Sequence, residues 1–152
     1  LVGCGATSDG YHMSAPHPEA AGAIAAMRAA LAGAALSPAD IDYVNLHGTG
    51  TRANDAAEDR AMLAVFGADT ACSSTKGWTG HPLGASGIVQ AAIAGLCLRH
   101  GFIPGGLHVT RLDPTFGAKV ILDNVGGPVR RVMCNAFGFG GINCSLVFAA
   151  GT

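Results

Sequence analysis

The hydrophobic and polar positions in the first third of the chain alternate between strand-like and helical patterns. Residues 1–7 are apolar and glycine-rich, as at the end of a strand, and the polar residues 8–18 predict a surface loop. Alanines fill residues 19–36, with larger apolar side chains near helical spacing, which predicts a helix packed closely on a neighbour. The Ser-Pro pair at 37–38 is typical of an N-cap and first turn, and a short buried strand is predicted at 43–46.

The middle of the chain repeats this alternation of helix and strand. A polar loop separates the strand at 43–46 from a helix at 53–66, and residues 71–74 predict another short strand. Residues 80–100 then predict a long helix that is deeply buried, because its expected inner face is small and apolar. The residues of that face are Ile88, Ala91, Ala92, Gly95 and Leu96.

Two apolar runs near the end of the chain predict a β-hairpin. Residues 129–137 and 142–148 have strand lengths, and a glycine-rich tip, GFGG at 138–141, lies between them. The stretch from residue 113 to the first run is irregular. Helices that alternate with buried strands predict one α/β domain over 1–152, without a repeat or linker.

The composition indicates more buried surface than one small core provides. Of 152 residues, 49% are hydrophobic and only 12% are charged, whereas a typical domain has about 25% charged residues. This excess predicts an obligate partner surface, or a larger globule of which the chain is a piece. The chain also begins at Leu1, without a methionine and within an apolar run, so we expect a piece of a longer protein.

The charges and cysteines exclude several classes of protein. Nine Lys and Arg against ten Asp and Glu give a net charge of −1, which leaves no basic surface for a nucleic acid. Polar residues interrupt the long apolar stretches, so no membrane span is expected. The five cysteines are widely spaced without a CxxC pair, which predicts reduced thiols in a cytoplasm. No metal site is expected, because no metal-ligand spacing with the cysteines is shown by His12, His17, His100 and His108.

Two histidines occupy positions that suit a catalytic cleft. His47 follows the strand at 43–46, and His81 is expected at the start of the last predicted helix. A helix N-terminus disfavours imidazolium and keeps a neutral ring that can donate a hydrogen bond to a developing oxyanion. Lys76 and Glu58 are expected to pair nearby as a buried cation and its acidic partner. From these residues alone, structural histidines and a solvated surface pair remain alternatives.

Three motifs occur in the order and spacing of a known family. They are HGTGT at 47–51 with acidic residues after it, SSTKGWTGHPLGASG at 73–87, and NAFGFGGINCSLVF at 135–148. Together they resemble the C-terminal half of β-ketoacyl-acyl-carrier-protein synthases, and the resemblance covers essentially the whole chain. It implies the C-terminal half of a thiolase-like fold, a layered α/β structure with a mixed sheet.

The resemblance also implies roles for single residues. In the family, two histidines act on a malonyl thioester, a lysine and an acid accompany them, and a mobile phenylalanine at the acyl pocket completes the oxyanion hole. The matching residues are the catalytic His47, His81, Lys76 and Glu58, the second acid Asp55, the pantetheine contacts Thr49 and Thr51, the gate Phe139, and the supporting glycines Gly138, Gly140 and Gly141. Glycines would let this tip move and its main chain approach the reacting carbonyl, and an ordinary hairpin is the alternative.

The activity implied by the resemblance belongs to an intact enzyme. It is an acyltransferase that elongates an acyl chain by decarboxylative Claisen condensation, in fatty-acid or polyketide-type synthesis. Malonyl units arrive on the phosphopantetheine of acyl carrier protein, so no metal or further organic cofactor is expected. The expected partners are acyl carrier protein, the N-terminal half of the same synthase and, when intact, a second copy in a homodimer. That N-terminal half carries the cysteine nucleophile, so we expect this chain alone to be inactive.

Cys72 is the alternative nucleophile within the chain. The sequence DTACSS at 69–74 is similar to the family's nucleophile motif. No apolar helix follows it to lower the pKa of the thiol, so we expect Cys72 at a buried strand position. The other cysteines, expected as small core residues, are Cys4, Cys97, Cys134 and Cys144.

Three positions depart from the common pattern of the family. Pro82 and Ser86 make GHPLGASG similar to thiolases as well, and Ile142 stands where many synthases have threonine. Residues 135–139 lack the second catalytic cysteine that a thiolase carries there. The second hypothesis is a non-catalytic partner that keeps this fold, lacks the nucleophile and determines chain length. A degradative thiolase is the third hypothesis, because the cysteine it requires is missing.

Overall fold

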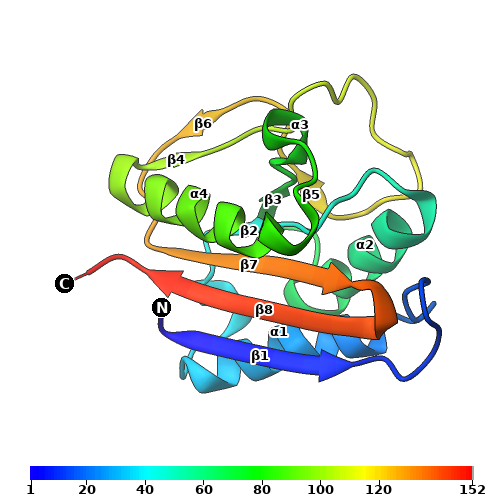
Figure 1. The fold of residues 1–152 in the computed structure, drawn as a ribbon. Coiled ribbons are helices and arrows are strands. Elements are labelled where there is room, and N and C mark those ends of the chain that lie inside the picture. Colours follow the sequence, from blue (N-terminus) through cyan, green and yellow to red (C-terminus); the bar gives the residue numbers. More distant parts are fainter. Residues whose placement is uncertain (152) are drawn as a thin grey trace.

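A six-stranded mixed sheet forms the centre of the computed structural model, which describes residues 1–151 (Figure 1). In spatial order its strands are β1 (Gly3–Ser8), β8 (Ile142–Ala149), β7 (Arg131–Gly138), β2 (Tyr43–Asn45), β3 (Ala71–Ser73) and β5 (Lys119–Val120). The pairs β1–β8 and β8–β7 are antiparallel, whereas β7, β2, β3 and β5 run parallel. The loops that follow β2, β3 and β7 therefore leave the same edge of the sheet, where α/β proteins place their ligands.

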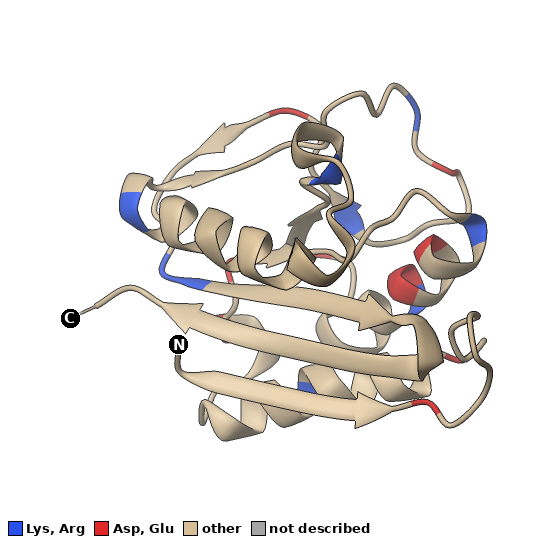
Figure 2. Ribbon diagram, in the orientation of Figure 1, with Lys and Arg blue, Asp and Glu red and all other residues tan. Residues whose placement is uncertain are grey.

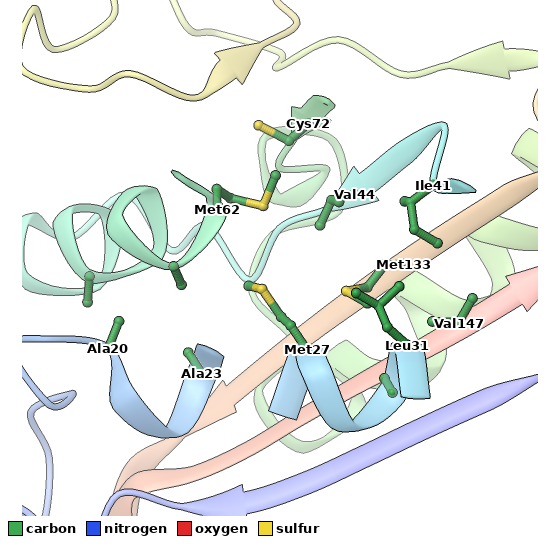
Figure 3. Packing of buried hydrophobic residues seen from close by; sticks show 13 residues of the cluster. Ala20, Ala23, Met27, Leu31, Ile41, Val44, Met62, Cys72, Met133 and Val147 are labelled. Carbon is green, nitrogen blue, oxygen red and sulfur yellow. The ribbon is translucent and has the colours of Figure 1, made fainter. Parts of the chain in front are cut away.

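Helices cover both faces of this sheet. The helices are α1 (Ala21–Gly33), α2 (Arg52–Phe66), α3 (Lys76–Thr79) and α4 (Ser86–His100), with 3-10 turns η1 (Pro38–Asp40), η2 (Leu83–Ala85) and η3 (Phe139–Gly141). The larger core lies where α1 and α2 meet the sheet, with Met27, Met62 and Val44 among its side chains (Figure 3). A smaller core around Tyr43 and Cys97 lies between the sheet and α4. The structure is therefore layered α/β, as predicted.

The contact between β1 and α1 depends on glycine. Gly5 faces the helix, and a Cβ atom at this position would lie 2.1 Å from the carbonyl oxygen of Ala26. We expect Gly5→Ala to lower the free energy of unfolding by about 2 kcal/mol, because the strand must move away from the helix. Gly33→Ala is the matched control, since its added Cβ would have no neighbour nearer than 3.7 Å and alanine favours the helix. Urea unfolding measures both variants, and equal stabilities would contradict the close packing.

The prediction of one helix over residues 80–100 is wrong in its first part. The structure places α3 and the turn η2 before α4 begins. Gly80 ends α3 with φ of 70°, and Leu83 has φ of 50°, so a continuous right-handed helix cannot pass through them. His81 consequently lies in the connection before α4 and not at the helix start.

The predicted inner face of α4 is also wrong. Ile88 and Leu96 are 72% and 48% exposed, whereas the polar Gln90 is buried with Ala94 and Cys97. Figure 2 shows that α4, β1 and β8 carry almost no charged residues. The exposed face of α4 is therefore not a charged surface of the kind that water usually covers. An exposed, uncharged helix face is the type of surface that the composition predicts for contact with a partner.

The other elements differ from the predictions in detail. α1 is shorter at both ends than residues 19–36, while the hairpin of β7 and β8 is confirmed. The short strands β4 (Phe102–Ile103), β5 and β6 (Val125–Gly126) were not predicted. Cys4 is exposed, so its expected core position is wrong, whereas Cys97 and Cys134 are buried and Cys144 is half-buried. No helix within residues 1–151 has the length and apolar character needed to cross a membrane.

Candidate active site

The loop that follows β2 is held at successive backbone groups. The N–H groups of His47 and Gly48 donate to the two carboxylate oxygens of Glu58 at 2.8 and 2.7 Å. The carbonyl of His47 accepts from Lys76 Nζ, and the carbonyl of Gly48 accepts from Ser74 Oγ at 2.7 Å. A Cβ atom at Gly48 would lie 2.4 Å from the Cβ of Ser74, and its φ is 41°, so this close approach requires glycine. The side chain of His47 therefore stands on a fixed main chain.

Glu58 is the buried anchor of this loop. The residue is only 3% exposed on α2, and Asn135 Nδ2 of β7 donates a third hydrogen bond to it at 3.3 Å. Asn135 is itself held by Ser145 Oγ, which donates to Asn135 Oδ1 at 2.8 Å. Burial raises the pKa of the Glu58 carboxyl, and the hydrogen bonds from Gly48, His47 and Asn135 oppose that shift.

Lys76 binds the peptide group between His47 and Gly48, which Glu58 also binds. The expected pairing of Lys76 with Glu58 is indirect, because Lys76 donates to the carbonyl of His47 whereas Glu58 accepts from the N–H of Gly48 in the same peptide group. The two charged groups form no ion pair within 4 Å. Burial lowers the pKa of Lys76, and the nearby charge of Glu58 opposes the shift. A cation and an anion thus orient one peptide group, which differs from the simple pair that the sequence predicts.

The structure brings the two predicted histidines together. The ring centroids of His47 and His81 lie 5.5 Å apart, with the ring planes nearly perpendicular at 81°. The ring of Phe137 on β7 lies 5.9 Å from that of His47. His81 Nδ1 lies 2.9 Å from Ser86 Oγ at the start of α4. Because His81 precedes α4 by several residues, its expected place at a helix N-terminus is wrong, and contact with a side chain orients the ring instead.

His47 is a buried neutral imidazole. It is 7% exposed, and burial, reinforced by the charge of Lys76 and by the nearness of a second titratable ring, lowers its pKa from the ordinary 6.5 to about 3. Between these two values the unfolded chain binds a proton at His47 that the folded chain does not. We therefore expect the free energy of unfolding to fall as the pH is lowered from 6.5 toward 3. His47→Gln should flatten this part of the curve, and parallel curves for the two proteins would contradict the assignment.

Gln90 is a site-supporting residue that the motifs do not reveal. Its Nε2 donates to the carbonyl of Leu46 at 2.9 Å and of Asn135 at 3.1 Å, and lies 3.3 Å from Asn45 Oδ1. These bonds tie α4 to the middle of β7 and to the end of β2, directly before His47. The sequence does hold one sign of this role. Gln90 is the one side chain from residue 87 to 96 that can form hydrogen bonds, and the rest of that segment is apolar.

The hairpin tip carries the predicted gate. Phe139 is 78% exposed, and Gly140 has φ of 81° and donates its N–H to the carbonyl of Met13 at 2.8 Å. Gly138 ends β7, and Gly141 is buried. The tip is therefore fastened to the polar loop at residues 8–18, and its aromatic side chain is open to solvent.

The predicted pantetheine contacts lie in the loop between β2 and α2. The hydroxyls of Thr49 and Thr51 are 2.9 Å apart, and Thr51 makes no side-chain bond that caps α2. Asp55 lies in the first turn of α2 and lines a cavity of about 360 Å³ with Glu58 and Arg111. Neither histidine lines this cavity. Within residues 1–151, no group of three or more His, Cys, Asp or Glu side chains is placed to hold a metal ion.

Comparison with known families identifies the chain. The family model described as the C-terminal domain of β-ketoacyl synthase matches residues 1–110. The chain belongs to the β-ketoacyl synthase family. The match includes both histidine motifs, and the hairpin of β7 and β8 lies beyond it.

Similar proteins cover the whole of this β-ketoacyl synthase domain. The mitochondrial 3-oxoacyl-(acyl-carrier-protein) synthase of Arabidopsis thaliana is 43% identical over 99% of the chain and 34% of its own length. The 3-oxoacyl-(acyl-carrier-protein) synthase 1 of Escherichia coli K12 is 42% identical over 97% of the chain and 36% of its own length. A solved structure of the ketosynthase ApeO in complex with its chain length factor ApeC, from Xenorhabdus doucetiae, matches with a TM-score of 0.92 and 47% identity, over 99% of the chain and 39% of that chain. The thiolase-like α/β fold is therefore confirmed, and the chain spans about a third of the length of these relatives.

Cys72 has none of the properties of a nucleophile in this β-ketoacyl synthase domain. It is fully buried on β3, as predicted, and its Sγ lies 3.5 Å from the carbonyl of Lys119. Burial raises the pKa of its thiol to about 12, so almost no thiolate exists at neutral pH.

Proposed function

We propose that this chain is the C-terminal domain of a condensing enzyme that elongates an acyl thioester with malonyl units carried by acyl carrier protein. The observation that supports the proposal is the pair of perpendicular imidazoles at the end of β2, one of which is neutral and stands on a clamped loop. Two neutral rings can each donate an N–H hydrogen bond to one developing oxyanion. The names of the similar synthases from Arabidopsis thaliana and Escherichia coli support the same chemistry.

The proposed reaction has two parts. In the first, the bond between the malonyl α-carbon and its carboxylate breaks, CO₂ leaves, and the electron pair moves onto the thioester as an enolate. His47 and His81 stabilise the enolate oxygen with hydrogen bonds. In the second, the α-carbon attacks the carbonyl of an acyl group held on cysteine, and the cysteine leaves as thiolate. Phe139 supplies its backbone N–H to the oxyanion of this step, and Thr49 and Thr51 contact the pantetheine arm.

The exposed apolar residues of α4 and of the hairpin tip are the proposed contact with a nucleophile-bearing N-terminal half. Ile88, Phe139 and Ile142 are 72%, 78% and 63% exposed, which is costly in water unless they are covered. The intact protein acts as a homodimer in this proposal. The five cysteines are free thiols, which suits a reducing compartment such as the cytoplasm.

The test is a condensation assay with the intact synthase that contains this domain. Acyl and malonyl groups on carrier protein are supplied, and the β-ketoacyl product and CO₂ are measured. We expect product from the intact synthase and none from the 152-residue chain alone, which has the enolate stabilisers without the nucleophile. Turnover by the chain alone would contradict the proposed division of labour, and an intact synthase that releases no CO₂ would contradict the function.

A chain-length-determining partner without a nucleophile is the second candidate, because a ketosynthase–chain length factor complex is among the similar structures. The presence of His47, His81 and Lys76 in one cluster favours the enzyme. Acylation of a cysteine in the N-terminal half separates the two, since only the enzyme is expected to retain an acyl group after denaturation.

A further inference from the structure

We propose that Ser86 is a positioning residue that fixes the tautomer of His81, so that the Nε2–H of this ring is the group presented to the substrate. The proposal rests on the proposed condensing function and adds a residue to its machinery. Ser86 lies at the start of α4, is 4% exposed, and places its Oγ 2.9 Å from His81 Nδ1. No other hydrogen bond of this hydroxyl occurs within residues 1–151.

The hydrogen-bond inventory decides which atom donates. If His81 carried its proton on Nδ1, that N–H would donate to Ser86, and the buried hydroxyl hydrogen would have no acceptor. If Ser86 donates to an unprotonated Nδ1, the hydroxyl hydrogen and the ring nitrogen are both satisfied. The second arrangement leaves no buried donor unpaired, so the proton of the neutral ring is on Nε2.

Helix capping does not explain the serine. Serine is common at helix starts because its oxygen accepts a hydrogen bond from a backbone N–H of the first turn. α4 has no side-chain capping bond, and its N-cap position is occupied by Ala85. The hydroxyl of Ser86 is therefore directed to His81 and not to its own helix.

The tautomer decides whether His81 presents a hydrogen-bond donor or a lone pair to the substrate. The two nitrogens of His81 point in different directions. Nε2 forms no hydrogen bond within residues 1–151, so it is free to donate. A donor is what the enolate oxygen of a decarboxylating malonyl thioester needs, whereas a bare nitrogen lone pair would repel it. Ser86 thus selects the productive form of His81 before the substrate arrives.

The experiment compares Ser86→Ala with Ser86→Thr in the intact synthase. Alanine removes the hydroxyl without a loss of helix propensity, and threonine retains it. We expect Ser86→Ala to lower kcat for malonyl decarboxylation about tenfold with little change in KM, and Ser86→Thr to stay within about twofold of the unmodified enzyme. Long-range spectra of ¹⁵N-labelled histidine, with His81→Gln to assign the signal, should show a single Nε2–H tautomer that becomes mixed in Ser86→Ala.

The two readouts separate this proposal from the proposed function. An unchanged tautomer in Ser86→Ala would overturn the role of Ser86 even if the synthase condenses as proposed. Equal losses of kcat in both variants, at unchanged thermal midpoints, would show that packing matters and the hydroxyl does not. Decarboxylation that survives in His81→Ala would instead overturn the function of the site, and the tautomer remains measurable without turnover.

Discussion

Replacing His81 with alanine in the intact synthase is expected to lower malonyl decarboxylation about 100- to 1000-fold, the usual effect of removing one oxyanion donor. The ring lies against His47. In the proposed reaction it donates a hydrogen bond that strengthens as the enolate forms. Loading of the acyl group onto cysteine precedes this charge development, so it should fall much less. Release of CO₂ and acylation of the enzyme are followed separately on the same protein.

The histidine at the far end of α4 provides the matched control. His100 is exposed in the last turn and has no contact with the histidine pair, so His100→Ala should stay within about twofold in both assays. If His81→Ala abolished acylation while decarboxylation continued at the unmodified rate, His81 would belong to activation of the cysteine. The enolate-stabilising role would then be wrong.

The edge of the sheet that holds the site was predictable from the sequence. His47 follows a short, mostly apolar run that predicts a buried strand, and glycines follow it at 48 and 50, so a polar loop at the strand's end was expected from the local pattern. The second histidine was placed through its motif and not through its helix. Three motifs in the right order therefore carried more information than the secondary structure around any one of them.

The backbone between α3 and α4 was not predictable from periodicity. Residues 80–85, GHPLGA, include Gly80, Pro82 and Gly84, and these helix-breaking residues are the signal that a helix assigned by periodicity ignores. The left-handed conformation of Leu83 is not encoded by its residue type. The same ambiguity reversed the inner face of α4. The exposed side of α4 is apolar, with Ile88 and Leu96 open to solvent. An apolar composition predicts that a face is covered, but it does not say whether this domain or a partner covers it.

The contacts that fix the loop were also hidden, because they join residues far apart in the chain. Glu58 was expected beside Lys76, yet its oxygens bind the main chain of the histidine loop. Asn135 lies in the motif of the predicted gate Phe139, and Gln90 lies in a helix whose other residues nearby are apolar, so neither position indicates its partner. Side chains that bind backbone leave no pairwise signature in a single sequence.

Removal of Glu58 is the second change for which we expect a large effect. Glu58→Ala would leave the N–H groups of His47 and Gly48 without acceptors in a buried loop, which should lower the free energy of unfolding by about 3 kcal/mol. Decarboxylation should fall about 100-fold in protein that is still folded, because the ring of His47 would no longer be held in place. Urea unfolding and CO₂ release measure the two effects.

Two further variants show whether the carboxylate itself is required. Glu58→Gln keeps one carbonyl oxygen for one N–H but directs amide hydrogens at the other, so its loss of stability should be intermediate. Glu19→Ala removes an exposed carboxylate whose ion pair with Arg60 is long at 3.9 Å, and it should cost less than about 0.5 kcal/mol. If Glu58→Ala were as stable and as active as Glu19→Ala, the loop would be held by Lys76, Ser74 and Gln90 without the acid. The carboxylate would then have no part in positioning His47, and its burial would need another explanation.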